Sequence, residues 1–190
     1  MFKDSITKEE LTDLPLKWFE GEIVIVDTYE KVKKAIKILL KETVIGFDTE
    51  TKPAFKKGVF NNVALLQLST QKQAFLFRLN EIGLPDEICR ILSNPALIKP
   101  GVAIHDDIKG LKQLGNFKPA GFVELQEHAK EMGIQNFSLK KLTGIVCGFR
   151  ISKGQQLSNW EADVLTESQR IYAATDAWAA LEIYLNFSDN

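Results

Sequence analysis

Hydrophobic and polar positions along the chain follow two periods, and each period predicts a different kind of element. Strands are expected in short, mostly apolar runs, at Glu22–Asp27, Val44–Glu50, Val63–Ser69 and Ala74–Leu79. Helices are expected where apolar residues recur three or four positions apart, at Tyr29–Lys41, Leu84–Leu92, Ile108–Leu114, Gln126–Met132, Ser138–Cys147 and Thr166–Phe187. A chain that mixes strands and helices in this order is typical of an α/β domain.

The links between the predicted strands indicate how the sheet is built. The second, third and fourth strands are joined only by a loop at 52–58 and by the tight turn Thr70–Gln73. Links this short indicate an antiparallel meander, because a parallel pair needs a long crossover. Further extended segments are expected at 96–104, interrupted by Pro100-Gly101, and at Phe122–Leu125. The predicted fold class is α/β, with a mixed sheet that is antiparallel on one side, parallel on the other, and flanked by helices on both faces.

The amino-terminal segment precedes the first strand and has its own helix signal. Thr7 and Glu10 have the spacing of a capping box, which indicates a short helix from Thr7 to Leu11. A chain of 190 residues is long enough to bury a core, and no interdomain linker interrupts it. We therefore expect one domain over residues 22–190 and an arm over residues 1–21 that packs on it.

Composition narrows the class of protein without identifying a partner. Hydrophobic residues make up 45% of the chain and charged residues 26%, as in an ordinary globular protein. No apolar run approaches the length of a membrane span and the first residues lack a secretory-signal layout, so a cytoplasmic protein with no membrane partner is expected. The net charge of −1 neither supports nor excludes binding to nucleic acid, because a local basic patch would suffice.

Two carboxylates stand at the end of the strand Val44–Glu50. Side chains alternate between the faces of a strand, so Asp48 and Glu50 project to the same side, whereas Phe47 and Thr49 point the other way. Like charges held this close need a cation, and we expect a metal ion.

A second acidic pair follows the extended segment that ends at Ile104. Helical spacing places Asp107 with Leu111 and Leu114 on the face that packs on the sheet. Asp106 falls on the solvent side of the helix, and we expect it to cap the helix. Asp107 is therefore the candidate metal ligand of this pair.

The last predicted helix contains a further candidate ligand, Asp176. Tyr172 and Asp176 are four residues apart and share one helix face, beside alanines that permit close packing on a sheet. An ionised Asp176 in that environment would be costly without a cation. With Asp48, Glu50 and Asp107 it completes a set of four oxygen ligands that suits Mg²⁺ or Mn²⁺ and argues against zinc.

These residues lie in three segments that resemble the motifs of the DEDD superfamily of DnaQ-like 3'-5' exonucleases. The segments are Phe47-Asp48-Thr49-Glu50, then Gly101-Val102-Ala103-Ile104-His105-Asp106-Asp107, then Ser158-Asn159-Trp160 with Leu165-Thr166 and Tyr172-Ala173-Ala174-Thr175-Asp176-Ala177. The third segment has a tyrosine four residues before its aspartate, and in this it resembles the DEDDy branch of the superfamily. Ribonuclease D and the exonuclease domain of the Werner syndrome protein belong to that branch. The resemblance runs from about Ile23 to the end of the chain.

The resemblance implies a ribonuclease H-like fold and the stepwise release of nucleoside monophosphates from a 3' end. It implies two divalent cations about 4 Å apart, Mg²⁺ or Mn²⁺, held by Asp48, Glu50, Asp107 and Asp176. Tyr172 would orient the attacking water through its hydroxyl, because a tyrosine with its ordinary pKa near 10 is a poor base at neutral pH. The implied partner is a single-stranded or recessed 3' end of DNA or RNA.

Substrate contacts are expected in and after the first motif. Thr49 would contact the terminal nucleotide with its backbone, as the equivalent position does in the family. The loop that follows mixes lysines and phenylalanines, which suits a single-stranded end, and the candidates in it are Lys52, Phe55, Lys56, Lys57 and Phe60. The alternative interpretation is a solvated turn with two phenylalanines in the core. For Trp160 the alternatives are stacking on a base and a place in the core.

Two other functions are compatible with the same residues. One is a nucleic-acid-binding module that keeps the fold but has lost turnover, and the presence of all four acids and the tyrosine argues against it. The other is a proofreading subunit that acts beside a polymerase, which would require a partner protein. Both remain alternatives to the metal-dependent exonuclease.

Overall fold

The computed structural model describes residues 2–54, 56, 58 and 60–188. The strands are β1 Glu22–Val26, β2 Gly46–Thr51, β3 Val63–Ser69, β4 Gln73–Arg78, β5 Lys99–Gly101 and β6 Phe122–Glu124. The helices are α1 Lys8–Asp13, α2 Tyr29–Leu39, α3 Leu79–Ile82, α4 Asp86–Leu92, α5 Ile104–Leu114, α6 Leu125–Glu131, α7 Leu139–Leu142 and α8 Glu167–Ser188. A π-helical turn, Thr143–Cys147, continues α7.

The sheet has the mixed topology that the sequence predicts. Strands β2, β3 and β4 form an antiparallel meander, and β1 pairs in parallel with β4, giving the order β1-β4-β3-β2. Strands β5 and β6 form a parallel pair. A parallel bridge between Val44 and Ile98, with the Ile45 amide donating to the Ile98 carbonyl at 2.9 Å, joins this pair to the beginning of β2. Strand β2 thus lies between the antiparallel and the parallel parts of the sheet.

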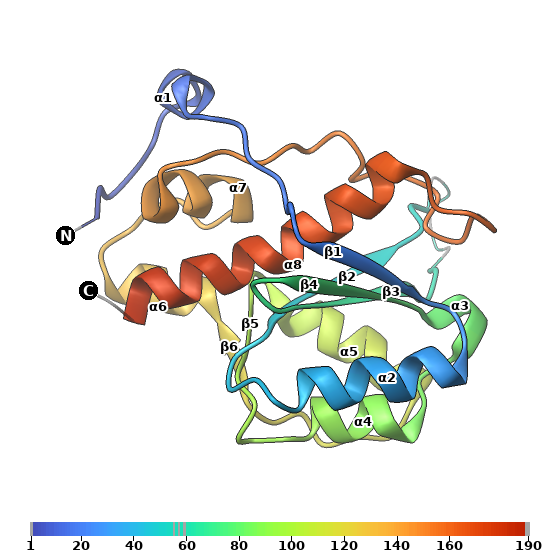
Figure 1. The fold of residues 1–190 in the computed structure, drawn as a ribbon. Helices are drawn as coiled ribbons and strands as arrows, with labels where there is room; N and C mark the ends of the chain where they lie inside the picture. Colours follow the sequence, from blue (N-terminus) through green and yellow to red (C-terminus); the bar gives the residue numbers. More distant parts are fainter. Residues whose placement is uncertain (1, 55, 57, 59, 189–190) are drawn as a thin grey trace.

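Helices cover both faces of the sheet, and the two faces are packed differently (Figure 1). On one face, side chains of α2, α4 and α5 form the largest hydrophobic cluster with Phe47, Leu66 and Phe77. On the other face, α8 crosses the strands and presents alanines to them. A side chain at Gly46 would lie only 1.8 Å from the Ala177 carbonyl oxygen, so α8 contacts β2 backbone to backbone. This close approach brings residues of α8 next to the acidic end of β2.

The start of α5 corrects two predictions. The helix begins at Ile104, four residues earlier than expected, and only Lys99–Gly101 of the predicted extended run is a strand. Asp106 lies within the first turn and does not cap the helix. The carboxylate of Glu124 caps it instead, accepting hydrogen bonds from the backbone amides of Ala103 at 2.9 Å and Ile104 at 2.8 Å. Because Glu124 of β6 supplies this cap, α5 begins earlier in the sequence than its own residues predict.

The segment before β1 packs along the rest of the chain. The capping box is present, with the Glu10 amide donating to Thr7 Oγ1 at 3.1 Å and the Thr7 amide donating to Glu10 Oε2 at 2.8 Å. Further along, the Phe19 amide donates to Thr175 Oγ1 of α8 at 3.0 Å. None of the helices in the described ranges is long and apolar enough to cross a membrane.

Candidate active site

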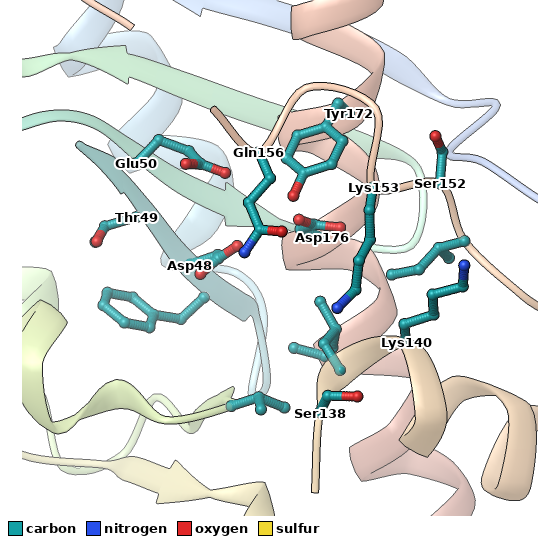
Figure 2. A pocket seen from close by; sticks show the side chains of 15 residues that line it. Asp48, Thr49, Glu50, Ser138, Lys140, Ser152, Lys153, Gln156, Tyr172 and Asp176 are labelled. Carbon is teal, nitrogen blue, oxygen red and sulfur yellow. The ribbon is translucent and has the colours of Figure 1, made fainter. Parts of the chain in front are cut away.

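Three carboxylates converge where β2 meets α8. Asp48 and Glu50 come from alternate positions of β2, and Asp176 comes from α8, which lies on that face of the strand (Figure 2). One carboxylate oxygen from each residue lies within 4.8 Å of the other two. The strand alternation and the close approach of α8 at Gly46 together produce this cluster.

Burial and mutual repulsion make ionisation of this cluster unfavourable. Loss of solvent raises the pKa of Asp48 well above its usual range, and the charges of Asp176, Asp107 and Glu50 add to the effect. Burial, with the charges of Asp176 and Asp107 adding to the effect, raises the pKa of Glu50 to about 9. Burial raises the pKa of Asp176 to about 7, although a hydrogen bond from Tyr172 and the charge of Lys153 act in the opposite direction.

The donor set fits a divalent cation. Carboxylate oxygens are the ligands that Mg²⁺ and Mn²⁺ prefer, and the cluster contains neither cysteine nor histidine. A bound cation would offset the repulsion between Asp48, Glu50 and Asp176 and would favour their ionised forms. Asp48, Glu50 and Asp176 are therefore the residues placed to hold such an ion.

Asp107 lies beside the cluster without joining it. It is partly buried on the first turn of α5, whereas Asp106 is exposed. The Asp107 carboxylate accepts a hydrogen bond from the Thr49 hydroxyl, a contact that the sequence did not reveal. Burial raises the pKa of Asp107 to about 6. Its negative charge raises the pKa of both Asp48 and Glu50, which places it within electrostatic reach of the cluster.

Tyr172 stands next to Asp176 on α8. Burial raises the pKa of its hydroxyl further, with the charges of Asp176 and Glu50 adding to the effect, so the phenol stays protonated at neutral pH. Its ring packs on Trp160 with 6.0 Å between ring centroids. Trp160 is fully buried in the core, so the alternative of stacking on a base is wrong for this residue.

The loop after β2 is only partly described. Lys52 forms an ion pair with Glu161 at 2.9 Å, and Lys56 is exposed. Phe60 has 94% of its surface exposed, which contradicts the interpretation of this residue as part of the core. The predicted contacts Phe55 and Lys57 lie outside the described residues.

A cavity of about 270 Å³ opens over the carboxylates and has a basic, polar opposite wall (Figure 2). The wall comes from the start of α7 and from the loop before α8, and its polar residues are Ser138, Lys140, Ser152, Lys153 and Gln156. Figure 2 shows Gln156 extending from the loop into the space between Asp48 and Asp176, and Lys153 extending from the same loop past Asp176. The sequence pattern does not identify these residues, although Lys153 is a cation in a polar loop just before the third motif.

This fold and site are those of a nuclease family. A family model described as 3'-5' exonuclease matches residues 23–190, so the chain belongs to the 3'-5' exonuclease family. The match confirms the family that the three motifs indicated.

Similar proteins agree with this assignment. The bifunctional 3'-5' exonuclease/ATP-dependent helicase WRN of Mus musculus is 34% identical over 195 residues, covering 96% of this chain and 14% of that protein. The exonuclease mut-7 homolog of Homo sapiens is 28% identical over 172 residues, covering 74% of this chain and 19% of that protein. This chain therefore spans less than one fifth of the length of these two relatives.

Solved structures share the fold. The Nibbler EXO domain of Aedes aegypti superposes with a TM-score of 0.81 at 24% identity, covering 92% of this chain and 91% of that one. Escherichia coli RNase D superposes with a TM-score of 0.77 at 19% identity, covering 88% of this chain and 46% of that one. These likenesses confirm the ribonuclease H-like fold that the motifs implied.

Proposed function

We propose that this chain hydrolyses nucleic acid from the 3' end and releases nucleoside monophosphates. The observation that carries the proposal is the convergence of Asp48, Glu50 and Asp176 within 4.8 Å at a cavity with a basic opposite wall, in a chain of the 3'-5' exonuclease family. An acidic site facing lysines suits a reaction that needs cations and a polyanionic substrate together. In this proposal the exonuclease domain spans residues 22–190, and residues 1–21 are an arm packed on it.

Asp48, Glu50 and Asp176 hold Mg²⁺ or Mn²⁺ in this proposal, and Asp107 completes the ligand set. Bound divalent cations would supply Lewis acidity for phosphodiester hydrolysis, and two ions is the number that the DEDD resemblance implies. Asp176 is buried and Asp48 and Glu50 are partly buried, which strengthens the electrostatic interactions within the cluster.

Tyr172 has a positioning role in this proposal. Its hydroxyl stays protonated because burial and the neighbouring carboxylates raise its pKa. It therefore acts as a hydrogen-bond donor or acceptor toward the attacking water and does not abstract its proton. Its place on α8, one helical turn before Asp176, keeps the hydroxyl close to the cluster.

The basic wall contacts the phosphodiester backbone. Lys153 extends past Asp176 and is exposed, and Lys140 lies beside it, so both lysines can reach a phosphate in the cavity. On the opposite side the backbone of Thr49 contacts the terminal nucleotide, and the exposed Lys56 contacts the backbone of the nucleic acid. Phe55 and Lys57 remain predicted substrate contacts that lie outside the described residues.

The substrate class is a nucleic-acid strand with a free 3' end. A Trypanosoma brucei RNase D, 22% identical over 90% of this chain, has been solved as a complex with RNA U12, which supports a single strand as the ligand. The choice between DNA and RNA is an outcome of the test below.

The test compares matched DNA and RNA single strands that carry either a free 3' hydroxyl or a 3' end blocked by a bulky label. We expect Mg²⁺-dependent or Mn²⁺-dependent release of nucleoside monophosphates, identified by chromatography, from the unblocked strands only. The faster of the two strands defines the substrate class. Equal release from blocked strands, or binding without release, would contradict the proposal, and binding without release would favour a binding module.

A further inference from the structure

Gln67 is a fully buried polar residue in the middle of β3. Within the part of the chain that the structure describes, neither its Oε1 nor its Nε2 has a hydrogen-bond partner. A buried amide without partners is destabilising relative to an apolar side chain of similar shape. The rest of β3 is buried and largely apolar, so packing alone would favour leucine or methionine at this position.

The register of the sheet places Gln67 directly opposite Asp48. The two residues are paired across the antiparallel strands β2 and β3. Opposed residues of such a pair point to the same face, with their Cβ atoms about 5 Å apart. The Gln67 side chain therefore lies on the face of the sheet that α8 covers, together with the carboxylate cluster.

The other neighbours of Gln67 on this face offer its amide no hydrogen-bond partner. Gln67 is paired with Leu76 across strands β3 and β4, and Leu65 lies two residues earlier on β3. Two residues later, the Ser69 hydroxyl donates its hydrogen bond to the Thr70 carbonyl at 2.8 Å. Among these neighbours, Asp48 is the one whose side chain both needs a hydrogen-bond donor and belongs to the candidate site.

We propose that Gln67 is a positioning residue, whose side-chain amide donates a hydrogen bond to the Asp48 carboxylate when that carboxylate holds a divalent cation. The inference rests on the proposed function and adds a residue to it. A carboxylate that shares a cation with Glu50 and Asp176 must keep one orientation, and an amide donor from the neighbouring strand fixes it. A polar group retained at a cost in stability is typical of a residue that serves a site.

The variant that tests this is Gln67→Met, which keeps the volume and removes the amide. We expect its stability in chelator to equal or exceed that of the wild type, because the unpartnered amide is gone. We expect its affinity for Mn²⁺, measured by calorimetry without substrate, and its kcat to fall about tenfold each, as for other residues that orient a metal ligand. KM for the oligonucleotide should change less than about twofold.

The matched control is Leu76→Met, a substitution of the neighbouring buried residue on the same face. Wild-type Mn²⁺ affinity and kcat in Gln67→Met would overturn the inference, and so would a loss of stability in proportion to the loss of activity. A wild-type protein that binds Mn²⁺ but lacks turnover would refute the proposed function, while the Mn²⁺ affinities would still decide the role of Gln67.

A crystal structure of the wild-type chain with Mn²⁺ provides a second test that does not depend on the folding of a variant. We expect Gln67 Nε2 within about 3.2 Å of an Asp48 carboxylate oxygen. A Gln67 amide directed away from Asp48 in that structure would overturn the inference.

Discussion

The side chains of Tyr172 and Asp176 lie one helical turn apart on α8, close enough for the Tyr172 hydroxyl to lower the pKa of the Asp176 carboxyl. This placement puts the candidate water-orienting group beside a candidate metal ligand. Replacing Tyr172 by phenylalanine should leave the fold and the metal affinity intact, because the ring still packs on Trp160. Turnover should fall about 100-fold, the usual scale for loss of a group that orients the reacting water.

Steady-state kinetics and Mn²⁺ calorimetry of Tyr172→Phe check this expectation. Tyr184→Phe is the control, because Tyr184 lies on the same helix in a different hydrophobic cluster. Wild-type turnover in Tyr172→Phe would remove Tyr172 from the mechanism.

Replacement of Asp176 by asparagine should separate stability from activity. Without a cation, Asp176 is a buried carboxylate beside Asp48 and Glu50, so its removal relieves repulsion. In chelator at pH 8 the free energy of unfolding should rise by about 1 kcal/mol, whereas nuclease activity should be lost. Urea unfolding measures the first effect, with the exposed Asp163→Asn as control. A large loss of stability in chelator would show that Asp176 serves the fold more than a cation site.

The two aspartates at the start of α5 should behave differently. Asp107 bonds to Thr49 and acts electrostatically on Asp48, whereas Asp106 is exposed. We expect Asp107→Asn to reduce turnover at least about tenfold at a fixed Mg²⁺ concentration, and Asp106→Asn to keep wild-type turnover. The reverse result would show that the second motif supplies its ligand from Asp106.

The buried Lys99 should make stability depend on pH. Its Nζ is enclosed by the carbonyl oxygen of Asn94 at 3.0 Å, that of Leu97, and the Phe122 ring. Burial lowers its pKa to about 8 in the folded chain, below the value of about 10.4 in an unfolded one. Between these two values the unfolded chain binds more protons, so stability rises with pH over that window.

The variant Lys99→Met should lack this contribution. From pH 8 to pH 10 the free energy of unfolding of the wild type should rise relative to that of Lys99→Met. The rise should be at most about 1.4 kcal/mol per pH unit. Urea unfolding at several pH values measures it, with the exposed Lys109→Met as control. Parallel pH profiles for the wild type and Lys99→Met would contradict the lowered pKa.

The features that the sequence predicts well depend on local pattern. The capping box of Thr7 and Glu10 and the antiparallel meander are set by residues close together in the chain. Asp48 and Glu50 project from the same face of β2 because side chains alternate along a strand. Tyr172 and Asp176 lie on the same face of α8 because they are four residues apart in a helix. These short-range rules are enough to identify the residues that form the carboxylate cluster.

The features that the sequence does not predict depend on contacts between distant segments. The early start of α5 needs the carboxylate of Glu124, about twenty residues downstream, to bond the amides of Ala103 and Ile104. The ion pair that engages Lys52 joins it to Glu161, 109 residues away. The basic wall at Lys140 and Lys153 faces the carboxylates only once α7 and the loop before α8 have packed. No local periodicity encodes these contacts.

The proposed exonuclease activity is tested directly by the degradation of 5'-labelled single-stranded DNA and RNA of equal sequence, with Mg²⁺, Mn²⁺ or a chelator, beside the Asp48→Ala variant. We predict a ladder of products shortened from the 3' end that requires the metal and disappears in the variant. Asp48 belongs to the carboxylate cluster, so its loss should abolish cation-dependent turnover while the chain still binds the oligonucleotide. The absence of a ladder from wild-type protein that binds both strands would contradict the proposed exonuclease activity.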